Sequence, residues 1–260
     1  MYEADKEEIP ENTCATILCA VYTATHNPIA IALPGKNSEL EYAISQLTSF
    51  VKRLCHTDLV VRSDGESAIT AIVDKLLADI MKARVQTKVR PAETRRYSSQ
   101  SLGAVGRMQA TTQAQVRTLK TALETRIKKH VVASMAIWPW LVRHTAWLIE
   151  RFQMRANGFT IYEHCYGSRY VGIVLRFGEA AVFRHPVGTA ASRAEKTGKQ
   201  LRKAKAANKF DMGVWLGKAY EIDERYFGTS DGVFTARTCR RVVAKEQWVA
   251  ERLVAVTGLP

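Results

Sequence analysis

The sequence predicts an α/β fold in which helices flank a mixed sheet, followed by a smaller module rich in strands. Two observations lead to this prediction. Short apolar runs alternate with segments of helical periodicity through the first half of the chain, and after Gly172 the pattern changes to short alternating runs. The 260 residues suffice for one domain of about 150 residues and a smaller module. We therefore expect two domains, at residues 1–170 and 172–260.

Two strands and a helix open the pattern. Residues 14–22 are nearly continuous in β-branched and apolar side chains, which predicts a strand covered on both faces. Asn27-Pro28 marks a turn, and residues 29–33 form the returning strand. The helix that follows has Ser38 as its cap and Glu41 as the capping-box partner. Its apolar residues recur at helical spacing: Leu40, Ala43, Ile44, Leu47, Phe50, Val51 and Leu54.

The next elements are a strand at residues 59–62, a helix at 67–83 and a strand at 85–89. Residues 90–103 are rich in Arg, Ser and Gln and break the regular pattern before a long helix at 104–130. At ~100° per residue, this helix has one apolar stripe that predicts core contact: Val105, Met108, Val116, Leu119, Leu123 and Ile127. Its basic side chains lie on the flanks of this stripe or opposite it, either as a DNA-facing surface or as an ordinary solvated face: Arg107, Arg117, Lys120 and Lys128.

The rest of the chain predicts one more helix and a group of strands. The helix at residues 136–152 carries Trp138, Trp140 and Trp147, which we interpret as core packing and not as platforms for base stacking. Thr229-Ser230-Asp231-Gly232 is a strong hairpin signal. Strands are expected at residues 177–183, 213–217 and 232–238. Between the first two lies a basic insertion, residues 184–209, with eight Lys or Arg and one acid.

The charge of the chain is large and uneven. The formal net charge is +13, yet residues 1–58 carry −4, so the remainder carries +17. This asymmetry favours a polyanionic partner, most simply nucleic acid, although a generally basic surface would give the same number. The basic insertion, with Arg202, Lys203 and Lys205, fits non-specific phosphate contact or a solvated insertion without a partner.

Several classes of protein are disfavoured. No apolar run reaches the ~18 residues of a membrane span, and the acidic start of the chain is unlike a secretory signal, so we expect no membrane partner and an intracellular location, nuclear or cytoplasmic. The five cysteines form no Cys-x-x-Cys pair, which argues against structural zinc. Phosphate-binding glycine loops and the Gly-x-Ser-x-Gly elbow are also absent from the sequence.

Four local features, in their order along the chain, resemble the catalytic core of retroelement integrases of the retroviral and copia type. Ser63-Asp64-Gly65 closes a short strand, Gly103 precedes the long helix, Gly106-Arg107 lies in its first turn, and Thr160-Ile161-Tyr162-Glu163 follows the next helix. The order strand-strand-helix-strand-helix-strand is that of a ribonuclease-H-like core without its first strand. The β-rich part resembles the small module that follows the core in copia-like polyproteins.

The resemblance implies an Asp-Asp-Glu triad that holds two Mg²⁺ or Mn²⁺ ions for phosphoryl transfer. Asp64 matches the second carboxylate and would bind a metal weakly by itself. Asp5 is the candidate for the first carboxylate. Gly106 stands where the family has its Glu, so a metal ligand is missing, and Glu93 in the preceding loop is the remaining acid that could replace it.

Three functional hypotheses follow. The first is a degenerate integrase domain of a retrotransposon polyprotein, which binds nucleic acid and is catalytically inactive; a homodimer is implied by the resemblance alone. The second is a non-catalytic nucleic-acid-binding or scaffolding protein that uses the basic long helix and the basic insertion at residues 184–209. The third is an active metal-dependent nuclease or strand transferase with a rearranged site made of Asp5, Asp64 and Glu93.

Overall fold

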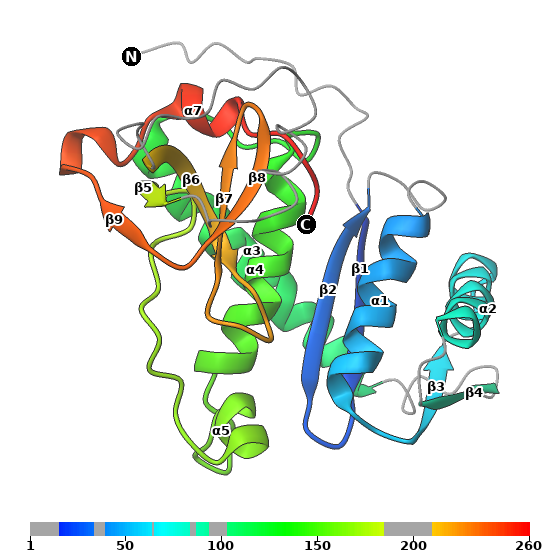
Figure 1. Cartoon of the computed structure of the whole chain (residues 1–260). Helices are drawn as coiled ribbons and strands as arrows, with labels where there is room; N and C mark the ends of the chain where they lie inside the picture. The colour runs from blue at the N-terminus through cyan, green and yellow to red at the C-terminus, as the bar shows by residue number, and fades with distance from the viewer. Residues whose placement is uncertain (1–15, 34–39, 64, 84–86, 94–102, 185–209) are drawn as a thin grey trace, which may run out of the picture.

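The part of the chain that the structure describes has a mixed α/β fold with helices and three sheets (Figure 1). The computed structural model describes residues 16–33, 40–63, 65–83, 87–93, 103–184 and 210–260. Asp5, Ser38, Asp64, Arg202, Lys203 and Lys205 lie outside these ranges. Among the described residues, no helix is long and apolar enough to span a membrane.

The first sheet is an antiparallel hairpin of β1 (Thr16–Tyr22) and β2 (Asn27–Leu33). Every residue of β2 is buried, whereas every residue of β1 is only half-buried. We expected β1 to be covered on both faces, and both of its faces do touch hydrophobic clusters. Its coverage is incomplete because, within the described ranges, β1 pairs with β2 along one edge and with no strand along the other.

The second sheet is a parallel pair, β3 (Asp58–Ser63) and β4 (Lys88–Glu93). Helix α1 (Leu40–Leu54) precedes β3, and α2 (Ser67–Lys82) connects the two strands. Strand β4 is later than the predicted strand at 85–89. The prediction ended the strand at Val89, but Pro91 also pairs with Val61 within β4, because an edge strand tolerates a residue that lacks a backbone N–H.

Two long helices follow, α3 (Gly103–Ile127) and α4 (Ile137–Phe152), and then the short α5 (Ile161–Tyr166). The apolar stripe predicted for α3 is confirmed from Val116 onward, where Val116, Leu123 and Ile127 are buried and Leu119 packs against them. Val105 and Met108, at the start of the stripe, are only half-buried. The interpretation of the tryptophans as core residues is also confirmed. Trp140 and Trp147 are buried, and Trp138 packs against the hydrophobic cluster that contains Trp140.

The third sheet is antiparallel, with the strand order β8-β7-β6-β5-β9. It is formed by β5 (Ala180–Arg184), β6 (Phe210–Lys218), β7 (Arg225–Thr229), β8 (Gly232–Ala236) and β9 (Cys239–Arg241). The three predicted strands and the hairpin turn at 229–232 are confirmed. Strands β7 and β9 were missed. A single 3₁₀ turn (Ala244–Glu246) and α7 (Ala250–Val254) complete the described chain.

Two hydrophobic clusters lie on the two faces of β2. Ile29, Ile31 and Leu33 join the side chains of α1 and α2 in one cluster, whereas Ala30 and Ala32 join the cluster of α3, α4 and the third sheet. This alternation is the period of two expected of a strand. The second cluster takes residues from both sides of position 171, and the division into residues 1–170 and 172–260 stays a prediction.

Candidate nucleic-acid interface and the expected carboxylate positions

The carboxyl ends of β3 and β4 lie at the place where the resemblance expects the second carboxylate. In the parallel register, Ser63 is the partner of Glu93. Gly65 has a left-handed φ of +73° and leads the chain into α2, a turn that glycine makes without strain. The backbone therefore brings Glu93 beside the residue that precedes Asp64, at an end of the strands where α/β sheets commonly bind ligands.

Gly106 lies in the first turn of α3 and is exposed. A Cβ atom added at this position would meet no atom within 4 Å. The first turn of α3 also contains no acidic residue. Steric crowding therefore does not explain why a glycine stands at the position where the resemblance places a catalytic Glu.

The described residues do not assemble the donor set of a two-metal site. Gly106 has no side-chain oxygen, and no group of three or more His, Cys, Asp or Glu side chains with metal-binding geometry occurs within the described ranges. Two-metal phosphoryl transfer requires several oxygen ligands around both ions. We therefore derive no catalytic step from this site, and the Mg²⁺ or Mn²⁺ expected of an active enzyme stays a prediction.

His26, in the turn between β1 and β2, feels the charges of two basic side chains from other segments, Arg107 of α3 and Arg155 after α4. Arg107 is exposed on α3, and Arg155 donates a hydrogen bond from Nη1 to the Thr25 backbone oxygen in the β1–β2 turn, at 3.3 Å. Burial lowers the pKa of His26, and the charges of Arg155 and Arg107 lower it further. Of these three residues only Arg107 could be selected from the sequence, because His26 and Arg155 approach it only in the folded chain.

Helix α3 carries an excess of positive charge, with four basic residues and one acid, Glu124. Arg107 and Arg117 are both exposed and lie about 80° apart around the axis. They lie away from the buried stripe that contains Val116 and Leu123. Lys128, just beyond the end of the helix, is exposed as well. These three cations are available to a polyanion.

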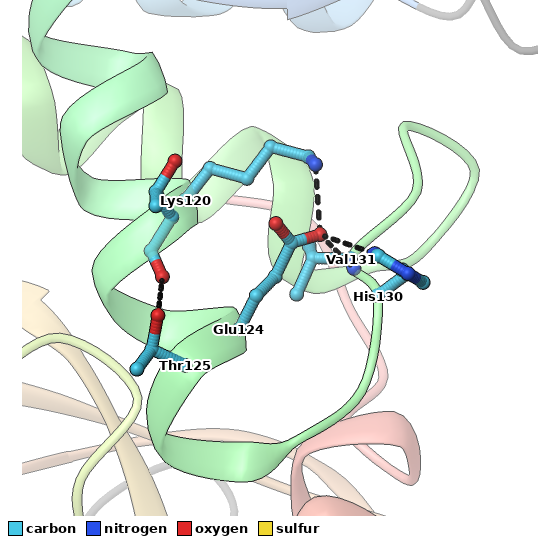
Figure 2. Close-up of polar contacts among 6 residues, drawn as sticks. Lys120, Glu124, Thr125, His130 and Val131 are labelled. Carbon is cyan, nitrogen blue, oxygen red and sulfur yellow. Dashed lines mark hydrogen bonds and ion pairs between the residues drawn. The ribbon is translucent and has the colours of Figure 1, made fainter. Parts of the chain in front are cut away.

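Lys120 differs from these three cations because it has a protein partner. Its Nζ lies 2.7 Å from Oε1 of Glu124, and Figure 2 draws this contact as a dashed line. The same carboxylate accepts a hydrogen bond of 2.7 Å from the backbone N–H of Val131 and lies 3.5 Å from Nδ1 of His130. Partial burial opposes ionisation of Glu124, but the hydrogen bonds from Lys120 and Val131 outweigh it and lower its pKa. Lys120 thus stabilises the end of α3, and its predicted contact with nucleic acid stays untested.

The segment Thr160–Glu163, part of the resemblance, has a clear local role. The Thr160 hydroxyl accepts a hydrogen bond from the Glu163 backbone N–H at 3.0 Å, and the Glu163 carboxylate accepts one from the Thr160 backbone N–H at 2.9 Å. This reciprocal pair is a capping box that starts α5. These backbone bonds, together with Arg169, lower the pKa of Glu163.

Comparison with known proteins adds little to this description. No protein-family model and no curated protein matches the chain. Among solved structures, the chain is similar to one chain of a simian T-cell lymphotropic virus intasome in complex with the PP2A regulatory subunit B56 gamma. The identity is 11%, the match covers 88% of this chain and 77% of that chain, and the TM-score is 0.43. At that TM-score the two chains are not shown to share a fold.

Proposed function

We propose that this chain is a nucleic-acid-binding domain with an integrase-like, ribonuclease-H-like core that does not catalyse strand transfer. The observation that carries the proposal is the first turn of α3. It presents an open, uncharged Gly106 where an integrase needs a carboxylate, and directly beside it an exposed Arg107. The site thus favours attraction of phosphate over coordination of metal.

Two further observations support the proposal. The order of elements, an antiparallel hairpin followed by helix, strand, helix and parallel strand, is the order expected for a ribonuclease-H-like core without its first strand. The positive charge is concentrated after residue 58, where the chain carries +17. As a retroelement domain, the chain would act inside the cell, in the nucleus or cytoplasm, and as a homodimer.

Salt dependence of DNA binding tests this function. Each phosphate that a protein cation neutralises adds about 0.9 to the slope of log K against log salt. We expect tight binding of a labelled duplex at ~50 mM salt that weakens steeply by ~200 mM. The double variant Arg107→Gln/Arg117→Gln should lose up to about 2 from the slope. Lys82→Gln, an exposed cation in the last turn of α2, is the matched control and should change the slope little. Binding that does not depend on salt would contradict the proposal.

One observation favours the alternative, an active enzyme with a rearranged site. The register of β3 with β4 brings the backbone of Glu93 beside Ser63, the residue that precedes Asp64 in the sequence. If Glu93 and Asp64 bind metal, duplex DNA should be nicked in Mn²⁺, and both Asp64→Asn and Glu93→Gln should abolish the nicking. We expect no nicking by the natural chain.

A further inference from the structure

A row of aromatic side chains lies at the end of α4, along α5 and just after it. The ring centroids of Phe152 and Tyr170 are 5.8 Å apart, those of Tyr170 and Tyr162 are 5.4 Å apart, and those of Tyr162 and Tyr166 are 4.5 Å apart. We call these four residues the aromatic row. Its two end members are exposed, Phe152 to 47% and Tyr166 to 54%. The row therefore presents aromatic surface to solvent at both of its ends.

The inner side of the aromatic row rests on a buried cation. The guanidinium carbon of Arg151 lies 5.2 Å from the ring centroid of Tyr162 and 5.4 Å from that of Tyr170. Arg151 is itself held by Glu150, with 3.1 Å between Nη1 and Oε2, and both side chains are buried. The buried ring of Trp147 packs against the start of the row. The rings are thus held in position from the protein side before any ligand binds.

The segment that carries the aromatic row is basic. Residues 151–176 contain four arginines and one acid, Glu163, interleaved with five aromatic residues. Glu163 is engaged within the protein, because its carboxylate caps α5 and lies 2.9 Å from Nε of Arg169. The Arg169 side chain is still 77% exposed. Aromatic rings combined with arginines are typical of surfaces that bind single-stranded nucleic acid, where bases stack on the rings and cations follow the phosphates.

The aromatic row also adjoins the side of the molecule that we assign to duplex DNA. Cys165 of α5 forms a side-chain hydrogen bond with Thr25, whose backbone oxygen accepts the hydrogen bond from Arg155. The next residue, His26, feels the charges of Arg155 and Arg107. These neighbours connect α5 through the β1–β2 turn to Arg107 on α3. A strand that leaves a duplex bound at Arg107 therefore meets basic side chains on its way to the row.

We propose that the aromatic row stacks unpaired bases, so that the ligand of this chain is a nucleic acid with a single-stranded part beside a duplex. This inference rests on the proposed function and specifies its substrate class. Phe152 and Tyr166 supply the exposed ring surface, and Arg155 and Arg169 attract the phosphates of the same strand. The excess of arginine over acid favours a polyanion over an apolar protein partner. Stacking on aromatic rings tolerates every base, so the row does not select a sequence.

Binding of the full chain to three DNA probes tests the inference. The probes are a blunt duplex, the same duplex with a short unpaired thymidine tail at each end, and the same duplex with abasic tails of equal length. The abasic tails add phosphates without bases. We therefore expect the thymidine-tailed probe to bind more tightly than both of the others.

Variants of the row locate the bases. Tyr166→Ala and Phe152→Ala should each lower the affinity for the thymidine-tailed probe about fivefold or more, with no change in the affinity for the blunt duplex or in the salt slope. Tyr166→Phe keeps the ring and should bind as the natural chain does. Met154→Ala removes an exposed apolar side chain that has no ring, and this matched control should also leave binding unchanged.

Three results would overturn the inference. Equal affinity for the thymidine-tailed and abasic probes would mean that phosphate charge alone binds the tail. Unchanged affinity in the ring variants would mean that the bases lie elsewhere; if one variant does not fold, the other decides. A homodimer that dissociates in Tyr166→Ala while tail binding is intact would assign the row to contact between copies of this chain. In all three cases, salt-dependent binding of the blunt duplex leaves the proposed function standing, whereas absence of binding to every probe overturns both.

Discussion

The first turn of α3 and the cluster around Tyr220 are opposite kinds of environment in one chain. At Gly106 the backbone is exposed, the surrounding space is open and the first turn contains no acidic residue. Around Tyr220, arginines are stacked on aromatic rings, and Glu150 and Arg151 form a buried pair. The place where the resemblance expects catalysis is thus the one with fewer contacts and fewer charged groups. The charged groups with fixed positions belong instead to residues that no sequence motif marked.

The largest expected effect on stability comes from removing one partner of the buried Glu150–Arg151 ion pair. Glu150→Ala leaves the guanidinium of Arg151 buried without its carboxylate, which should reduce the free energy of unfolding by about 3–5 kcal/mol. Urea denaturation measures this loss. The double variant Glu150→Leu/Arg151→Met removes both charges and should retain much more stability than the single variant. A single variant that is as stable as the natural chain would mean that the pair is not buried in solution.

The second effect is a dependence of stability on pH through His144, a buried neighbour of this cluster. Burial, and then the charges of Arg143 and Arg151, lower its pKa from 6.5 to about 3. The unfolded chain therefore binds a proton that the folded chain does not, and stability is lost as the pH falls from 6.5 towards 3. The loss should approach about 1.4 kcal/mol per pH unit within this window. His144→Gln, followed by urea denaturation at several pH values, should remove that part of the slope. An unchanged slope would show that other groups cause the acid sensitivity.

The smallest expected effect on stability concerns Gly106, in the exposed first turn of α3. Gly106→Ala should stabilise the chain by about 1 kcal/mol, because glycine is a poor helix former and the position is free of contacts. Gly106→Glu should add about 0.3–1 kcal/mol more, since a negative charge in the first turn interacts favourably with the helix dipole. Gly106→Lys should lack this second gain. Thermal unfolding of the three variants compares them, and a destabilising Gly106→Ala would mean that the glycine has a structural role.

Most regular elements could be predicted from the sequence because their signals are local. The stripe of α3 and the turn at Ser230-Asp231 each depend on residues close in the chain. Thr112 was missed because it is polar, although it lies on the stripe four residues before Val116 and is fully buried. Its spacing from Met108 and Val116 is the signal that could have identified it.

The stacking of Arg53 on Tyr220 could not be predicted, because the two residues meet only in the folded chain. Arg53 and Tyr220 are separated by most of the sequence, yet their side chains stack. Neither residue belongs to a recognisable motif, and a tyrosine followed by acids resembles an ordinary loop. The expected catalytic carboxylates present the opposite case, in which the sequence motif is clear and the structure does not describe the residues. Their motif was visible, but Asp5 and Asp64 lie outside the described residues and stay predictions.

One measurement tests the central claim most directly: incubation of the chain with end-labelled duplex DNA in Mn²⁺ from ~50 to ~200 mM salt, with binding and strand integrity followed in the same samples. The account predicts binding that weakens steeply with salt while both strands remain intact. Cleaved or joined strands that disappear in Asp64→Asn would contradict it, because they would show a working metal site despite Gly106.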